Sequence, residues 1–248
     1  MRIIFILLLV ISVSCSSSLN RKEATNAENR TTITTNAGGS GSTIDIDFYK
    51  GKSFYRPLMA FWLEDTSGNY IQTLYVARSV ATGTFRYAKQ SGNKWIPGPK
   101  RAPQTLPYWA HKRGVQASDG LYMPEPEKPV ADAYTGATPL TGFSVHSKSD
   151  NPLPDKFNVM MEINENWDWN QYWTNDKYPD DEYYKMSCQP AVVYSVLVDR
   201  NRPGASYKMK PAGHSHYSGK TGELFPDLST LTTALHIADS VIVRVNNQ

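Results

Sequence analysis

The strongest constraint on the fold is a pair of strand-like runs separated by a short turn. Residues 58–63 and 70–76 consist mainly of aliphatic and aromatic residues, and they flank the turn sequence DTSGN at residues 65–69. Two β-prone runs around a turn that contains Ser, Gly and Asn are typical of a β-hairpin. The sequence therefore predicts a hairpin over residues 58–76.

Further strands are expected along the chain. Ile44, Ile46 and Phe48 alternate with their neighbours, and this period of two indicates a half-buried strand. The other strands are expected at residues 142–146, 157–164, 191–199 and 240–245. Long loops are expected at residues 91–129 and 164–190, and short helices at residues 167–173 and 228–236. About seven strands between turns rich in Pro, Gly and Asn predict an all-β fold, an immunoglobulin-like β-sandwich with long loops and one or two short helices.

Residues 1–15 have the features of a lipoprotein signal peptide. A positive start at Arg2 is followed by an apolar run at residues 3–13, and Ser14 stands directly before Cys15. The apolar run is a signal-peptide core and is too short to span a bilayer, which takes about 20 residues. We therefore expect export to the cell envelope and membrane contact through a lipid on Cys15, on the periplasmic or the outer-membrane side. An ordinary secretory signal cut nearby is the alternative.

The segment that follows is polar. Residues 16–42 contain almost no apolar side chains and end in a Gly/Ser tract, a composition typical of a flexible tether. No second stretch of this kind occurs later in the sequence. We therefore expect residues 43–248 to form a single elaborated β-sandwich domain.

Composition and charge argue against several classes of function. The 26 Lys and Arg residues are scattered among 23 Asp and Glu residues, whereas a nucleic-acid-binding protein shows a clustered basic stripe. The sequence has no Gly-x-Ser-x-Gly or His-Glu-x-x-His motif, and no spacing that supports a metal site. Cys188 is unpaired once Cys15 is lipidated, and we expect it to be buried. We therefore expect no nucleic-acid partner and no metal, and a redox carrier or binding module is favoured over a hydrolase.

One motif points to a cofactor. Residues 132–138 read DAYTGAT and resemble the Asp-x-x-(Ser/Thr)-Gly-Ala-Thr signature at which a dedicated transferase attaches FMN to a threonine hydroxyl. The resemblance implies that Thr138 carries FMN through a phosphoester bond, with an FMN transferase and a membrane redox partner. Gly136 permits backbone conformations closed to other residues. The loop that presents the hydroxyl would be formed by Asp132, Thr135, Gly136 and Ala137. The same residues also suit a tight turn before a strand.

A wider stretch of the chain carries a second resemblance. The hairpin at residues 56–74, the triplet Pro107-Tyr108-Trp109 and the motif at residues 132–138 lie between residues 54 and 145. Together they resemble a bacterial family of predicted periplasmic proteins, domain of unknown function 2271. The resemblance implies a β-sandwich outside the cytoplasm, and members of this family are suspected of carrying flavin.

Aromatic residues supply candidate ligand contacts. Tyr108, Trp109 and Tyr134 are candidates for stacking on a flavin ring, with packing in the core or in a turn as the alternative. A second cluster is a candidate platform for a flavin or a sugar ring, or else a cap over one end of the sandwich; it comprises Trp167, Trp169, Tyr172 and Trp173. Two functions follow from these patterns. One is a lipid-anchored carrier of covalent FMN that transfers electrons near the membrane, and the other is a cofactor-free envelope module that binds glycan or protein.

Overall fold

The computed structural model describes residues 30–202 and 204–246. The expected signal peptide, Cys15 and about half of the expected tether lie outside these described residues. From Thr31 onward, the described residues belong to one compact unit. No helix in the described part of the chain has both the length and the apolar character needed to cross a membrane.

The folded unit begins earlier than expected, so the predicted boundary at Thr43 was wrong. β1 (Thr31–Thr35) pairs in parallel with β8 (Phe143–Lys148) along its whole length. The side chain of Thr35 is buried and donates a hydrogen bond to the Leu74 carbonyl oxygen at 2.7 Å. Thr and Ile are β-branched and favour strands. The TTITT run therefore forms a strand inside a stretch whose overall composition is that of a linker.

The Gly/Ser tract after β1 is packed against the sandwich. The Gly41 amide donates a hydrogen bond to the Ser149 carbonyl oxygen at 2.9 Å, and a Cβ at Gly41 would overlap the Ser149 side chain. The Ser40 hydroxyl donates to the Asp150 carbonyl oxygen at 2.6 Å. Gly41 therefore permits the close approach of two backbones, a role that composition alone does not distinguish from linker flexibility.

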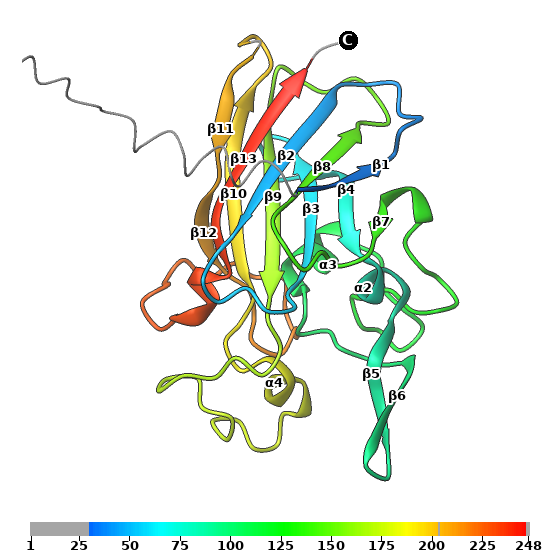
Figure 1. Ribbon diagram of the computed structural model, residues 1–248, viewed down its shortest axis with the longest axis vertical. Coiled ribbons are helices and arrows are strands. Elements are labelled where there is room, and N and C mark those ends of the chain that lie inside the picture. Colours follow the sequence, from blue (N-terminus) through cyan, green and yellow to red (C-terminus); the bar gives the residue numbers. More distant parts are fainter. Residues whose placement is uncertain (1–29, 203, 247–248) are drawn as a thin grey trace, which may run out of the picture. The chain divides into compact units, whose positions relative to one another are not determined.

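Two large sheets form a β-sandwich, which confirms the predicted fold class (Figure 1). The five-stranded sheet has the order β1, β8, β2 (Thr43–Lys50), β13 (Ala238–Asn246) and β11 (Ser206–Lys208). The six-stranded sheet has the order β12 (Lys210–His214), β10 (Val192–Asp199), β9 (Lys156–Asn164), β3 (Leu58–Glu64), β4 (Tyr70–Ala77) and β7 (Thr135–Gly136). A separate hairpin extends away from both sheets (Figure 1) and consists of β5 (Thr84–Ser91) and β6 (Lys94–Pro99).

The expected strands are confirmed to within about two residues at either end, and they correspond to β2, β3, β4, β8, β9, β10 and β13. Neighbouring strands of the two large sheets are antiparallel except for the parallel pairs β1–β8 and β4–β7. The strands that sequence reasoning missed are short or lie at sheet edges, where an apolar period of two is weak.

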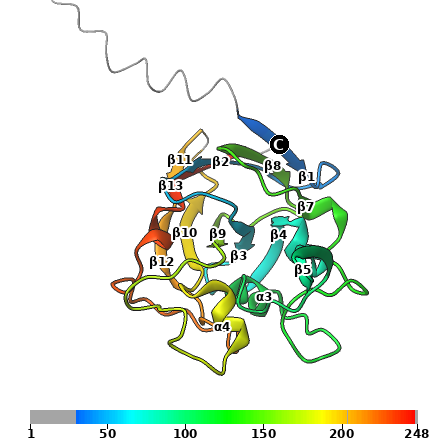
Figure 2. The same ribbon diagram turned by 60° about the horizontal axis from the view of Figure 1, so that its bottom comes forward.

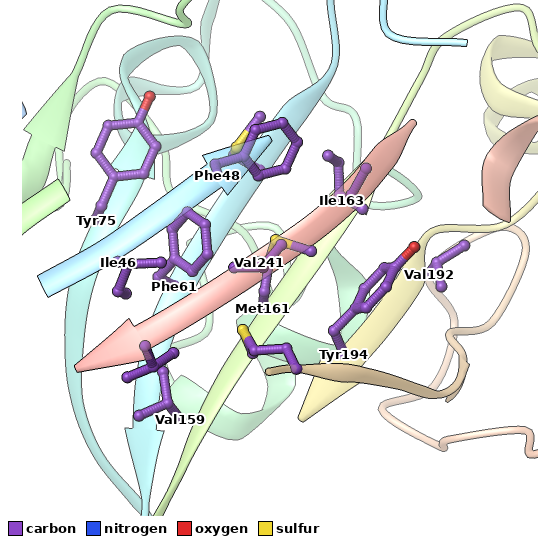
Figure 3. Packing of buried hydrophobic residues seen from close by; sticks show 14 of the residues in the cluster. Ile46, Phe48, Phe61, Tyr75, Val159, Met161, Ile163, Val192, Tyr194 and Val241 are labelled. Atoms are coloured by element: carbon purple, nitrogen blue, oxygen red, sulfur yellow. The ribbon is translucent and has the colours of Figure 1, made fainter. Parts of the chain in front are cut away.

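Side chains from the facing surfaces of the two sheets form the main core (Figure 3). β2 contributes Ile44, Ile46 and Phe48, all fully buried, because alternate residues of a strand point to the same face. The Phe48 ring stacks on the Phe143 ring of β8, with centroids 5.0 Å apart. From the facing sheet, β3 and β9 contribute Phe61, Val159, Met161 and Ile163.

β3 is buried on both faces, and the second layer of packing positions the candidate site. All seven residues of Leu58–Glu64 are buried, whereas one-sided burial gives alternation. α3 (Pro107–Arg113) packs on the outer side, where its Trp109 belongs to a second core together with Ala60 and Trp62 of β3. The continuous apolar run at residues 58–63 therefore reflects a strand enclosed between the other sheet and a helix.

The helices differ from the expected ones. In the described part the α-helices are α2 (Arg78–Thr82), α3 and α4 (Glu182–Ser187). Residues 167–173 are not helical, so that prediction was wrong, and residues 228–236 contain only the 3-10 helix η2 (Thr233–His236). The three α-helices have 5, 7 and 6 residues. They complete fewer than about two turns and leave no recognisable apolar periodicity. The expected loop at residues 91–129 also contains β6 and α3.

Candidate functional site

A cavity of about 610 Å³ lies at the end of the sandwich that carries the three α-helices, which Figure 2 brings forward. Segments far apart in sequence line it: the loop before β3, α2 with the hairpin β5–β6, the loop before α3, the chain after β7, and the chain from β9 to α4. The volume falls within the range of about 300–1,000 Å³ that is typical of small-molecule and cofactor sites. This cavity is therefore the candidate ligand site.

Aromatic side chains form much of the cavity wall. The aromatic wall consists of Tyr55, Tyr87, Trp95 and Trp167, which are 71, 48, 46 and 60% exposed. Scattered exposed apolar residues are normal on a protein surface, whereas several grouped around one hollow indicate a surface for a ligand or a partner. The flat faces of these rings suit stacking on another planar ring.

Three cations line the cavity: Arg56, Arg86 and Lys100. Arg56 donates a hydrogen bond from Nη1 to the Tyr87 hydroxyl at 3.2 Å, and the Arg86 guanidinium lies 5.6 Å from the Tyr87 ring centroid. Lys100 Nζ lies 5.9 Å from the Trp95 ring centroid, and burial lowers the pKa of this amine. Cations held beside aromatic faces favour a ligand that is both planar and anionic.

The cavity lining also contains one acidic side chain among the described residues, Glu165. Burial raises the pKa of its carboxyl group to about 7. The amides of Tyr55 and Arg56 donate hydrogen bonds to the Glu165 carboxylate at 3.3 and 2.9 Å, and they oppose this shift. Near neutral pH the carboxyl group is therefore partly protonated, which reduces its repulsion of an anionic ligand.

The motif at residues 132–138 leads directly to the cavity. Its first residues form the 3-10 helix η1 (Asp132–Tyr134), and β7 then pairs in parallel with the end of β4. The Tyr75 hydroxyl donates a hydrogen bond to the Ala137 carbonyl oxygen at 3.0 Å. Thr138 follows, is partly exposed and lines the cavity. The fold thus brings the predicted attachment residue to the aromatic wall and the three cations.

Gly136 serves close packing. The sequence predicts a role in conformational freedom, but Gly136 is not among the glycines with positive φ. A Cβ at this position would lie 2.8 Å from Tyr75 Cε2 and 3.3 Å from Ile33 Cγ2. Tyr75 of β4 and Ile33 of β1 therefore hold the motif closely against the sandwich.

Gly136→Ala is expected to lower the free energy of unfolding by about 1–3 kcal/mol, the usual cost of forcing an extra methyl group into packed surroundings. Gly98→Ala is the matched control, because a Cβ there meets only the Ala88 Cβ, at 3.8 Å. Urea denaturation measures both variants. Equal free energies for the two variants would contradict the close packing of Gly136.

None of the three candidate stacking residues lines the cavity, and for Tyr108 and Trp109 the alternative of packing in the core is confirmed. Tyr108 and Trp109 are buried in the second core, and Trp109 Nε1 donates a hydrogen bond to Thr73 Oγ1 at 3.0 Å. The Tyr134 hydroxyl donates to the Asp150 carboxylate at 2.8 Å. Tyr108 and Trp109 are used in packing because α3 covers the apolar outer face of β3.

The second predicted aromatic cluster is divided in the structure. Trp167 lines the cavity, Trp169 and Tyr172 are exposed outside its lining, and Trp173 is buried in the main core. The four aromatic side chains therefore do not form one platform, because residues 167–173 are not helical. Trp167 has a φ of 63°, and its amide bonds the Met186 carbonyl oxygen at 3.1 Å. That backbone angle lies outside the right-handed helical region.

Sequence reasoning missed most of the cavity wall, including Tyr55, Arg56, Tyr87, Trp95 and Lys100. One signal was present in the sequence, because residues 84–101 contain five Lys or Arg residues and no Asp or Glu. The chain as a whole is nearly balanced in charge. This local bias marks the hairpin β5–β6 and the segment after it as the basic side of the cavity.

Within the part of the chain that the structure describes, neither Cys188 nor a group of potential metal ligands forms a reactive site. Cys188 is buried, as expected, and burial raises the pKa of its thiol to about 11. Such a thiol is inert near neutral pH, because the thiolate is the nucleophile. Across residues 30–202 and 204–246, no group of three or more His, Cys, Asp or Glu side chains is placed to hold a metal ion.

Comparison with protein-family models, with curated proteins and with solved structures gives no match for this chain. The functional interpretation therefore depends on the motif and on the cavity that Thr138 lines.

Proposed function

We propose that this protein carries FMN covalently on Thr138 and transfers electrons near a membrane. The observation that carries the proposal is the position of Thr138. This residue ends a motif that resembles a flavin-attachment signature, and it lies in the lining of a cavity with aromatic and cationic walls. Outside the cytoplasm there is no pool of free flavin to replace a cofactor that dissociates. A covalent bond keeps the cofactor on the protein without the need for tight noncovalent binding.

Attachment requires a hydroxyl that a modifying enzyme can reach. The Thr138 oxygen would attack the FMN phosphorus of FAD, so that a phosphoester bond forms as the pyrophosphate bond breaks. AMP leaves with the electron pair of the broken bond, and the threonine proton passes to a base of the transferase. Thr138 is partly exposed, and Pro139 restricts it to extended conformations. Both features suit a presented nucleophile.

The cavity lining suits a flavin in shape and in charge. FMN, when bound, supplies reversible transfer of one or two electrons. The aromatic wall offers flat faces to its ring, and the three cations oppose the negative charge of a phosphate or of a reduced ring. The partly protonated Glu165 adds little repulsion.

The partners follow from the same proposal. The signal-like start of the sequence and Cys15 support a lipid-anchored protein of the cell envelope. An FMN transferase of that compartment would perform the attachment, and a membrane redox complex would exchange electrons with the cofactor.

The intact mass of the exported protein tests the proposal. Co-expression with an FMN transferase is expected to add the mass of one FMN to the chain, together with flavin fluorescence that stays with the chain after denaturation. A chain that remains unmodified, under conditions that load a control flavoprotein, would overturn the proposal.

Glycan binding is the second candidate, and exposed aromatic side chains outside the cavity favour it. Trp169 is 56% exposed, and its aromatic face also suits a sugar ring. Tyr172 is 52% exposed, but Lys177 Nζ lies over its ring, 3.2 Å from the centroid. Oligosaccharides are then expected to quench tryptophan fluorescence, and Trp169→Ala is expected to reduce the quenching. No response across a panel of glycans would remove this candidate.

A further inference from the structure

Two adjacent polar side chains of the cavity lining, Gln104 and Thr105, each have one buried oxygen atom without a hydrogen-bond partner among the described residues. Gln104 and Thr105 are only 1 and 2% exposed, and both belong to the cavity lining. Among the described residues, neither Gln104 Oε1 nor Thr105 Oγ1 has a hydrogen-bond partner. Buried polar atoms are nearly always paired, so such an orphaned pair at a cavity calls for a ligand or ordered water.

The backbone of residues 102–105 is held in place by a hydrogen bond within the segment and by close contact with Gly219. The Thr105 amide donates to the Ala102 carbonyl oxygen at 3.1 Å. A Cβ at Gly219 would overlap the Pro103 backbone, so the two segments are in close contact. Gly219 has a φ of 78°, a conformation that glycine adopts readily. The segment therefore cannot easily shift to give Gln104 and Thr105 new partners.

We propose that Gln104 and Thr105 bind the N–H and C=O edge of a planar heterocycle. An amide oxygen accepts a hydrogen bond from an N–H group, and a threonine hydroxyl can donate to a carbonyl oxygen. The pair is thus complementary to an edge on which a donor and an acceptor stand side by side. This inference rests on the proposed function for its ligand, because the pyrimidine edge of a flavin has an N3–H group between two carbonyl groups.

The opposite edge of a flavin has no such groups, so recognition also fixes the orientation of the ring. The pyrimidine edge lies against Gln104 and Thr105, and the dimethylbenzene edge is directed away from them. Gln104 and Thr105 therefore select for the ring itself, independently of the phosphate and of attachment to Thr138.

Binding of riboflavin to the Thr138→Ala variant tests the inference, because this variant cannot form the covalent bond. Riboflavin is expected to bind, and N3-methylriboflavin, which lacks the N–H donor, is expected to bind roughly tenfold or more weakly. Adding Gln104→Leu is expected to weaken riboflavin binding by about the same factor and to make the two flavins nearly equal. Thr105→Val is expected to weaken both flavins, because it removes the hydroxyl that donates to a carbonyl. Flavin fluorescence measures all of these affinities.

A second measurement separates binding from folding. Gln104→Leu is expected to unfold at the same or a higher temperature than its parent without ligand, because an unpaired buried amide oxygen is replaced by an apolar group. A Gln104→Leu variant that unfolds at a clearly lower temperature would show that Gln104 has a structural role and would overturn the inference.

The outcomes distinguish this inference from the carrier proposal. If the Thr138→Ala variant binds riboflavin and N3-methylriboflavin with equal affinity, the inference is overturned, even if FMN is found on Thr138 of the wild-type chain. The unpaired oxygen atoms of Gln104 and Thr105 would then be hydrogen-bonded to water. No binding of riboflavin would overturn it as well. Binding with the expected dependence on N3–H, in a protein whose Thr138 is never modified, would support the inference and reject covalent attachment.

Discussion

The Thr138→Ala variant is expected to carry no covalent flavin, whereas the wild-type chain co-expressed with an FMN transferase is fully loaded. The loss should be complete because the Thr138 oxygen is the only atom through which the proposed phosphoester bond can form. Intact-mass spectrometry and flavin fluorescence of the denatured chain measure the result. The fold is expected to be unaffected, since Thr138 is partly exposed.

Two matched variants make this result specific. Thr138→Ser keeps a hydroxyl at the same place and is expected to be loaded. Thr141→Ala removes an exposed threonine hydroxyl just outside the motif, which donates to the Gly142 carbonyl oxygen at 3.2 Å, and it is expected to keep the covalent flavin. A loaded Thr138→Ala variant, or loss of flavin from Thr141→Ala, would contradict the assignment.

The second large effect concerns stability, which is expected to fall as the pH rises through a buried carboxyl group. Glu162 of β9 is fully buried and accepts hydrogen bonds from the amides of Tyr108 and Trp109, at 3.2 and 2.8 Å. Burial raises the pKa of Glu162 from 4.5 to about 7, although these two amides and Ser215 oppose the shift. The folded state therefore binds the proton more tightly than the unfolded state does.

The sign of the pH dependence follows from this difference. Below about pH 4.5 the Glu162 carboxyl group is protonated in both the folded and the unfolded state, so it does not make the free energy of unfolding depend on pH. Between about pH 4.5 and 7 only the folded state keeps the proton, so the free energy of unfolding decreases as the pH rises. Above about pH 7 the decrease is complete, and its size is on the order of 3 kcal/mol.

Glu162→Gln is expected to remove much of this dependence, because a neutral amide resembles the protonated carboxyl group at every pH. Urea denaturation between about pH 5 and 8 measures the change, which should approach the size estimated from linkage. Glu127→Gln, which removes an exposed carboxylate, is the control and should keep the wild-type profile. In Glu162→Gln the free energy of unfolding is still expected to decrease with pH to some extent, because burial also raises the pKa values of Glu165 and Asp168. Parallel profiles for Glu162→Gln and the wild type would contradict the prediction.

Much of the sandwich could be predicted from the sequence, and particular strands show why. In β2, residues Ile44, Ile46 and Phe48 alternate with more polar neighbours because a strand exposes alternate faces. This period of two can be recognised in the sequence of the strand alone, without knowledge of its partner strands. β1 was missed because the TTITT run is surrounded by polar residues. Its formation as a strand depends on pairing with β8, whose residues follow more than 100 positions later.

The candidate site was predictable only in part. Thr138 could be identified because its motif is contiguous, and Trp167 because aromatic residues cluster around it in sequence. Trp109 and Trp173 have the same side-chain chemistry as Trp167 yet pack into the two cores. Which tryptophan faces a ligand is decided by the elements that cover each one, and no local pattern contains that information.

The sequence by itself determined the positions of the main strands along the chain, the hairpin of β3 and β4, and the small-residue segment that ends at Thr138, because each depends on neighbouring residues. Only the tertiary structure decided that Thr138 shares a cavity with an aromatic wall, three cations and the orphaned pair Gln104 and Thr105. That assembly joins five distant segments, and the packing of both faces of the six-stranded sheet brings them together. The backbone conformation of each segment is local, whereas its neighbours across the cavity are set by burial of apolar surface over the whole domain.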